Sequence, residues 1–289
     1  MKPIIFILLV LLATSLMGSS FTFGKMGLDY ASPLLLAGIR FTLAGLLMAF
    51  WVRNKKHPAS AIAWLKVATI GLFQTALVMG CIFLSLRTIT AGESAILTFI
   101  NPLLVIIFGT IVFRTRYRLS QWAGVVIGFV GVTVTLGFQM QLQTGTWLGL
   151  GSAVCWAIAT LLVKQWAGEM NIWVLTAYQM LCGGIVLVVL GLFIEAPHLV
   201  INMQSVGIIL YLAVLGSIVQ FAVWYYLLQQ GEPGRTSAFL FLAPFFGVLS
   251  GWLLLGEVVY TNVYRGGGLI LVGIFLANWR PGKLRDTAS

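Results

Sequence analysis

The chain has 289 residues, of which 60% are apolar and only 8% are charged. A soluble domain carries about 25% charged residues, so the composition excludes a single soluble domain of this size. The net charge of +10 does not indicate a nucleic-acid binder, because the basic residues form short clusters between apolar runs instead of covering one soluble face.

Long apolar runs follow one another along the chain. They are too long and too continuous for the alternating strands of a membrane β-barrel, so we predict an all-α integral membrane protein. The first run follows Lys2, as in a signal peptide, but it continues past the small-residue triplet at 13–15, and we expect an uncleaved helix. The ten predicted transmembrane helices cover residues 4–24, 32–52, 64–86, 93–113, 119–138, 146–166, 171–194, 205–229, 235–255 and 262–279.

Basic residues are distributed unevenly between the two predicted sides of the membrane. With the N-terminus inside, thirteen of the 17 Lys and Arg residues fall on the cytoplasmic side, three fall outside, and Arg40 lies within a span. Cytoplasmic loops of membrane proteins are enriched in Lys and Arg. The pattern therefore predicts a multi-pass protein of the cytoplasmic membrane with both termini in the cytoplasm, which requires an even number of spans.

The chain also contains an internal repeat. A shift of 142 positions places Gly92, Phe99, Pro102, Gly109, Gly124 and Gly131 on Gly234, Phe241, Pro244, Gly251, Gly266 and Gly273. A weaker echo at a shift of 139 relates Lys25 to Lys164 and Gly45 to Gly184. Five helices per repeat is an odd number, so the repeats must cross the membrane in opposite directions. Such inverted repeats are typical of secondary transporters, whose substrate site lies between the halves.

Several short motifs, taken in their order along the chain, point to a known family. They are Gly18-Ser19-Ser20-Phe21 with Lys25, Asn101-Pro102-Leu103, Trp156 with Lys164, Ala243-Pro244, and Leu253-Leu254-Leu255-Gly256-Glu257. In this order, and with the duplication, the chain resembles the EamA-like branch of the drug/metabolite transporter superfamily. One departure is that Arg114-Thr115 stands after the fourth helix, where the second half has Gly256-Glu257.

The resemblance implies a fold and an activity. It implies a first EamA-like repeat over residues 1–140, a second, inverted one over 141–280 and a cytoplasmic tail at 281–289, with the fifth and tenth helices at the periphery of a basket around a central cavity. It further implies a carrier that exports a small amphipathic metabolite, such as an amino acid, by alternating access. Import or facilitated diffusion of the same class of substrate fits the sequence equally.

Arg40 is the most informative candidate for substrate binding. It lies about eight residues into its predicted helix, roughly 12 Å deep at 1.5 Å per residue. A guanidinium at that depth is costly unless it is paired or hydrated. We weigh two roles, a clamp for a substrate carboxylate and a structural arginine tied to backbone carbonyls.

Amides and aromatic side chains supply the other candidates. Gln179 corresponds to Arg40 under the shift of 139, and it either binds substrate or bridges two helices. Gln220 and Trp224 are four residues apart and share a helix face, although Trp also anchors helices at the interface. Gln74 and Asn101 complete the predicted substrate-binding set.

Two prolines are candidates for gating. Pro102 and Pro244 are equivalent under the shift of 142, and each removes a helical hydrogen bond and kinks its helix. The kink either moves during transport or is a permanent bend.

No metal or cofactor is expected, because the three cysteines lie in apolar runs without ligand spacing. Glu93 is expected to pair with Arg87 at the outer surface, and no proton relay is visible. Substrate and lipid are the expected partners. The small-residue spacing of Gly124 and Gly128 predicts close helix packing, with a homodimer face at that helix as the alternative. Motifs of intramembrane metalloproteases and serine hydrolases are absent, so an enzyme, a channel or a scaffold is less well supported than a carrier.

Overall fold

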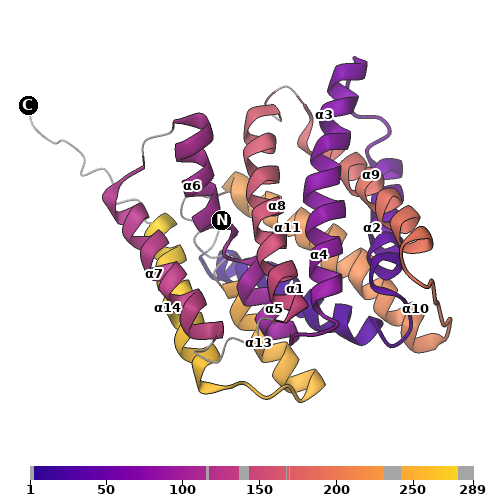
Figure 1. The fold of residues 1–289 in the computed structure, drawn as a ribbon. Helices are drawn as coiled ribbons and strands as arrows, with labels where there is room; N and C mark the ends of the chain where they lie inside the picture. Colours follow the sequence, from indigo (N-terminus) through magenta and orange to yellow (C-terminus); the bar gives the residue numbers. More distant parts are fainter. Residues whose placement is uncertain are drawn as a thin grey trace, which may run out of the picture.

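The computed structural model of the chain describes residues 3–114, 117–136, 143–166, 168, 170–230 and 242–278. Regular structure in these residues is helical, apart from one isolated bridge between Ala31 and Leu199. The predicted all-α class is confirmed, and the helices form a bundle in which most axes run between two common ends (Figure 1).

The helices lie close to the predicted spans. Their bounds are α1 Pro3–Gly27, α2 Pro33–Trp51, α3 Ala61–Gly71, η1 Leu72–Leu77, α4 Val78–Ser85, α5 Ala91–Thr98, α6 Asn101–Phe113, α7 Leu119–Leu136, α8 Thr144–Trp166, α9 Ile172–Phe193, α10 Met203–Leu210, η3 Tyr211–Val219, α11 Gln220–Gln230, α13 Leu242–Leu255 and α14 Thr261–Asn278. The segments α3–η1–α4 and α10–η3–α11 each form one continuous helical run.

Seven helical runs in the described residues are long and apolar enough to cross a membrane. They are Ile4–Gly27, Pro33–Trp51, Ala61–Ser85, Ala91–Val112, Thr144–Trp166, Ile172–Phe193 and Met203–Trp224. The apolar stretches Leu119–Gly131 and Leu242–Leu255 are shorter. Ten crossings therefore stay a prediction, and the predicted equivalents Gly234 and Phe241, the start of the span 235–255 and the tail 281–289 lie outside the described residues.

Side-chain caps explain where several helices begin. Ser60 accepts a hydrogen bond from the Ala63 amide at the start of α3, and Asn171 accepts bonds from the second and third amides of α9. A helix leaves its first four amides without internal partners, so short polar side chains at this position stabilise its start. These ends orient the spans whose side chains meet in the interior.

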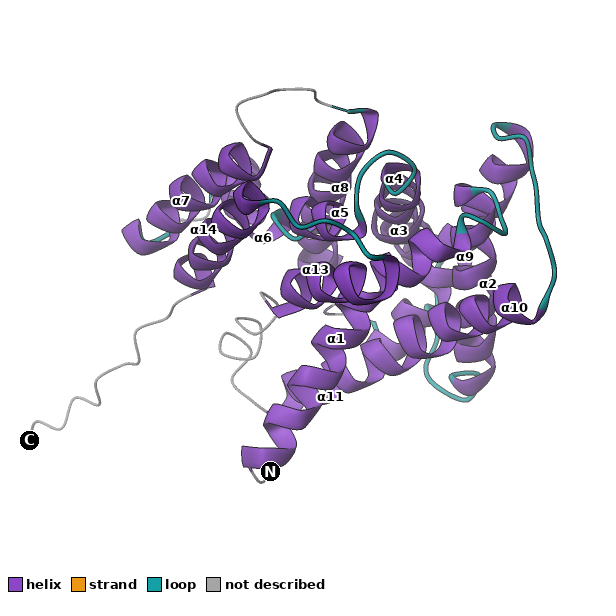
Figure 2. Cartoon of the chain, turned by 90° about the horizontal axis from the view of Figure 1, so that it is seen from below, coloured by secondary structure: helices purple, strands orange, loops and turns teal. Residues whose placement is uncertain are grey.

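Helices α2 and α9 pack side by side through glycines at equivalent positions (Figures 1 and 2). A Cβ added at Gly45 would lie 2.6 Å from the Leu181 amide nitrogen, and one added at Gly184 would lie 2.5 Å from that of Thr42. A shift of 139 converts the first contact into the second. The glycines let the two backbones approach closely, as small residues do between membrane helices.

Helices α7 and α14 form a second close pair, at one side of the bundle (Figures 1 and 2). A Cβ at Gly131 would lie 2.7 Å from the Gly266 carbonyl oxygen, and one at Gly273 would lie 2.6 Å from that of Gly124. The shift of 142 again relates the two contacts. The close helix packing that we expected at Gly124 and Gly128 is confirmed, but the partner there is Gly273 of the same chain and not a second copy.

Two π-helical segments, η1 and η3, interrupt the runs that contain α3 and α10. A shift of 142 carries η1 onto residues 214–219, inside η3. In a π turn each amide bonds to the carbonyl five residues back, which alters which side chains and carbonyls face a neighbouring helix; such turns occur frequently at functional sites. Both segments contribute residues to the interior cavity.

Candidate functional site

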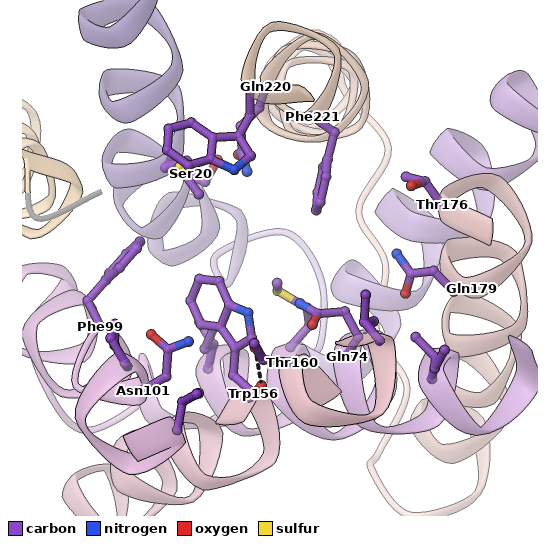
Figure 3. Close-up of a pocket in the computed structure, with 18 of the residues that line it drawn as sticks. Ser20, Gln74, Phe99, Asn101, Trp156, Thr160, Thr176, Gln179, Gln220 and Phe221 are labelled. Atoms are coloured by element: carbon purple, nitrogen blue, oxygen red, sulfur yellow. Dashed lines mark hydrogen bonds between the residues drawn. The ribbon is translucent and has the colours of Figure 1, made fainter. Parts of the chain in front are cut away.

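A cavity of about 530 Å³ lies in the middle of the bundle (Figure 3). This volume is within the usual range for small-molecule sites, about 300–1,000 Å³. The described lining includes all six residues predicted to bind substrate, which are Arg40, Gln74, Asn101, Gln179, Gln220 and Trp224. Of the two predicted gating prolines, Pro102 lines the cavity and Pro244 does not belong to the described lining.

Arg40 reaches the cavity from α2 and is held by η3. Its Nε donates a hydrogen bond to Ser217 Oγ at 3.0 Å, and its Nη2 donates to the Gly216 carbonyl oxygen at 2.6 Å. Ser217 in turn donates to the carbonyl of Leu212, five residues back. The guanidinium carbon also lies 4.6 Å from the centre of the Phe41 ring. Arg40 is only 4% exposed, and each of these partners is neutral, so they fix the cation without cancelling its charge.

Gln179 of α9 occupies the position in the second half that corresponds to Arg40 of α2 in the first half. Thr75 Oγ1, in η1, donates a hydrogen bond to Gln179 Oε1, in α9, at 2.7 Å. Shifts of 142 and 139 carry Thr75 onto Ser217 and Arg40 onto Gln179, so this contact is the counterpart of the Arg40–Ser217 bond. Gln179 therefore bridges two helices, one of the two roles weighed from the sequence, and its residue also lines the cavity.

Aromatic rings form one wall of the cavity. Phe99 lies between Phe21 of α1, at 6.2 Å between ring centres, and Trp156 of α8, at 5.3 Å. Figure 3 shows Phe99, Asn101 and Trp156 on the same side of the cavity. Flat aromatic surfaces of this kind stack on apolar or aromatic ligands.

The predicted single helix 93–113 is divided in two at this wall. It ends at Thr98, turns through Phe99 and Ile100, and restarts at Asn101, with Pro102 in the first turn of α6. The missing amide of proline costs least in a first turn, where it would have no helical partner. Pro102 is thus at the start of a new helix instead of within a kinked one, and the break directs Phe99 and Asn101 into the cavity. Pro244 lies in the first turn of the described part of α13.

Several lining residues are absent from the set predicted from the sequence. Ser20 and Gln220 share one side of the cavity in Figure 3, whereas Thr176 and Gln179 lie on another. The residues missed include Ser20, Phe99, Trp156, Thr160, Thr176 and Phe221. For Phe99 the repeat itself, which matches it to Phe241, was a usable signal; Trp156 and Ser20 were noted only as parts of family motifs.

A polar network lies at one end of the bundle, beyond the cavity residues of α1. Lys25 Nζ donates to Glu257 Oε1 and to the Ile89 carbonyl, both at 3.0 Å. The Glu257 carboxylate also accepts the amides of Ala91, at 2.8 Å, and Gly92, at 3.4 Å, at the start of α5. We call these five residues the end seal. It ties α1 and α5 of the first half to the residue that follows α13 in the second half.

Glu93 plays a local role next to this seal. Its carboxylate accepts hydrogen bonds from the amide and the hydroxyl of Thr90, and the Thr90 hydroxyl accepts the Glu93 amide, which forms a capping box at the start of α5. The expected pair of Glu93 with Arg87 is wrong, because a capping box satisfies the helix start within one turn of the chain.

The lining extends toward the opposite end of the bundle. It includes Tyr117, in the connection between α6 and α7, and Val163, three residues before α8 ends. That end is at the top of Figure 1, whereas α5 begins and α13 ends at the bottom. The lining therefore approaches one end of the bundle, whereas the end seal lies at the other end. Among the described residues no group of three or more His, Cys, Asp or Glu side chains is placed to hold a metal ion.

Comparison with known proteins identifies the family. The sequence profile of the EamA-like transporter family matches residues 4–137 and 143–279, which together cover nearly the whole chain. The chain belongs to the EamA-like transporter family.

Individual relatives of this EamA-family chain match it over most of its length. An uncharacterized transporter of Archaeoglobus fulgidus is 28% identical, over 92% of this chain and 95% of its own. A probable amino-acid metabolite efflux pump of Salmonella typhimurium is also 28% identical, over 93% of both chains. A crystal structure matches with a TM-score of 0.66 over 93% of this chain and 95% of its own at 18% identity, which shows a shared fold.

Membership in this family settles the broad class of the protein. The chain is a multi-span membrane transporter and not an enzyme, because the family and its named relatives are transporters. The resemblance inferred from the motif order is confirmed.

Proposed function

We propose that this EamA-family protein exports a small amphipathic metabolite, an amino acid or a related compound, by alternating access. The observation that carries the proposal is the central cavity, which combines aromatic side chains with a buried guanidinium and several amides. A similar protein of Salmonella typhimurium is named a probable amino-acid metabolite efflux pump. Import or facilitated diffusion of the same substrate class is the second candidate, because the cavity itself does not indicate the direction of transport.

The architecture proposed for this activity is a bundle of ten spans in two inverted repeats, over residues 1–140 and 141–280. Support comes from pairs of contacts that the repeat shifts interchange. The Gly45 and Gly184 contacts of α2 with α9 form one such pair, and the Gly131 and Gly273 contacts of α7 with α14 form another. Reciprocal contacts of this kind arise when two similar units meet across a two-fold axis, which is the arrangement that lets the halves rock about a central site.

The proposed binding residues are Arg40, Gln74, Asn101, Gln179, Gln220 and Trp224. Their polar groups would hydrogen-bond the head of a substrate, and the aromatic rings would contact its apolar part. Pro102 and Pro244 are proposed to shape the gates, since proline limits how the ends of helices can bend. Substrate and lipid are the proposed partners, without nucleic acid; a homodimer would need a face other than that of Gly124 and Gly128.

The proposed orientation has both termini, including the tail 281–289, in the cytoplasm of a cell whose cytoplasmic membrane holds the protein. The distribution of basic residues supports it. In this orientation the cavity extends toward the cytoplasm and the end seal lies at the outer surface. That is the state in which an exporter would load its substrate.

Metabolite profiling tests the proposal directly. Medium and cytosol would be compared between cells that overexpress the wild type, an Arg40→Ala variant, and an Arg53→Ala variant as a control for the loss of an exposed arginine on the loop that follows α2. We expect the wild type and the control to enrich one metabolite in the medium, and Arg40→Ala at equal membrane abundance to lose this enrichment. Depletion of the metabolite from the medium would favour import, and unchanged metabolites in all strains would contradict a transport role.

A further inference from the structure

The two halves place different chemical groups at equivalent positions of the cavity. Arg40 donates a hydrogen bond to Ser217, and Thr75 donates one to Gln179, at the positions that the repeat shifts interchange. The hydroxyls of Ser217 and Thr75 are equivalent, whereas the cation of Arg40 corresponds to the neutral amide of Gln179. The lining therefore carries a positive charge at one of two equivalent positions, and a ligand that fills the cavity meets chemically unequal groups.

The charge of Arg40 is held in place but not neutralised. The side chain carries five N–H donors, and its two hydrogen bonds use only Nε and one N–H of Nη2. The N–H groups on Nη1 form no hydrogen bond within the part of the chain that the structure describes, and the one ion pair found there is that of Lys25 with Glu257. A buried, unpaired guanidinium is energetically costly, and a carboxylate with its two oxygens is the group that best pairs with it.

The rest of the lining suits a flat apolar body. Phe99 contacts the rings of both Phe21 and Trp156, and Phe221 points into the cavity from α11 (Figure 3). The polar side chains near them are amides and hydroxyls, which hydrogen-bond a ligand without cancelling a charge. An ammonium group in this cavity would therefore face the Arg40 cation with only neutral acceptors around it.

We propose that the substrate is a small organic acid with a net negative charge, whose carboxylate pairs with Arg40 and whose flat apolar body stacks on Phe99 and Trp156. This inference rests on the proposed transport function, and within the class of small amphipathic metabolites it selects organic anions over zwitterionic amino acids. Zwitterions such as amino acids bind more weakly than the corresponding acids, because the guanidinium repels their ammonium group. A doubly charged phosphate should bind more weakly than a carboxylate, because the single guanidinium of Arg40 balances only one negative charge.

A series of four ligands with the same ring and different charges tests the inference. The probes are 3-phenylpropionate (anion), phenylalanine (zwitterion), 3-phenylpropanol (neutral) and 2-phenylethylamine (cation). Their binding to the purified full-length protein in lipid nanodiscs would be measured by titration calorimetry at neutral pH. We expect the anion to bind at least about tenfold more tightly than the alcohol, the zwitterion to fall between them, and the amine to bind weakest.

Three variants separate charge recognition from folding. Arg40→Gln keeps a hydrogen-bonding side chain and should reduce the preference for the anion over the alcohol to about onefold, whereas Arg40→Lys should retain a preference with weaker binding. Arg53→Gln removes an exposed arginine outside the cavity lining and should change nothing. If Arg40→Gln does not fold, the ligand series measured on the wild type and on Arg40→Lys still tests the preference for the anion.

Several outcomes would overturn the inference. They are equal or tighter binding of the alcohol or the amine, a preference for the anion that survives in Arg40→Gln, and no binding by any of the four probes. Metabolite profiling keeps this failure separate from that of the proposed function. Export of a zwitterion or a cation would support the transport function and refute the anionic substrate. Binding of the anion without any metabolite movement would support the anionic ligand and contradict the transport function.

Discussion

The end seal offers a sharp test of alternating access, through the substitution Glu257→Gln. The Glu257 carboxylate accepts hydrogen bonds from Lys25 Nζ at 3.0 Å and from the Ala91 amide at 2.8 Å, with a longer contact to Gly92 at 3.4 Å. Glutamine has nearly the same shape and keeps one oxygen acceptor. The substitution therefore removes the negative charge while it preserves packing.

The magnitude follows from these contacts. A hydrogen bond to a charged group contributes about 1.5–3 kcal/mol, and a carboxylate at a helix start adds about 0.3–1 kcal/mol. Water screens the carboxylate little, since its side chain is 9% exposed, but it screens Lys25 more, at 30%. We therefore expect a loss of about 2 kcal/mol from the sealed state, which shifts the equilibrium between the sealed and the open state about 30-fold toward the open one.

Pulsed electron paramagnetic resonance can measure this shift. Spin labels would be attached at Asp29→Cys and Val258→Cys, two exposed positions that follow α1 and α13 at the sealed end. The native cysteines, Cys81, Cys155 and Cys182, would first be replaced by alanine. In nanodiscs, Glu257→Gln should add a population with a longer distance between the labels that is minor in the parent protein.

Glu93→Gln is the matched control. It changes the neighbouring acid at the same helix start, but the capping box of Glu93 and Thr90 lies within one half of the chain, and glutamine also fits such a box. The reasoning is refuted if Glu257→Gln leaves the distance distribution unchanged, or if Glu93→Gln changes it equally.

Three further predictions concern packing and the cavity. Gly273→Val should lower the melting temperature in detergent, since its Cβ would lie 2.6 Å from α7 backbone atoms and overpacking costs about 1–3 kcal/mol. Gly268→Val on the same helix meets open space and should leave the melting temperature unchanged. Equal effects of the two substitutions would refute the packing argument. Thr75→Val should destabilise the protein by about 1–3 kcal/mol in chemical denaturation, because it leaves the buried Gln179 oxygen without its donor; no change would mean that the oxygen finds another partner. Trp156→Leu should weaken binding of an aromatic probe about tenfold in calorimetry, since aromatic contacts contribute about 0.5–1.5 kcal/mol beyond buried area; undiminished affinity would place the ligand elsewhere.

The sequence alone determined the helical class and the approximate positions of the helices. The reason is physical: a membrane-spanning segment must satisfy its backbone hydrogen bonds within itself, so a local apolar run is sufficient to predict it. The expected span 32–52 became α2 Pro33–Trp51, for example. The duplication and the depth of Arg40 within its helix could also be predicted from the sequence, because both follow from counting residue positions along the chain.

Only the tertiary structure decided which residues meet. Arg40 contacts Ser217 at a separation of 177 residues, and Lys25 contacts Glu257 at a separation of 232. Apolar helices pack in many registers at similar energies, so one sequence does not specify these partners. The same limit explains why the face of Gly124 proved to be covered by α14, and why the helix break that directs Phe99 into the cavity was expected as a kink. The local hydrogen bonds of each helix are fixed by its own residues, whereas the cavity is a property of how the helices pack.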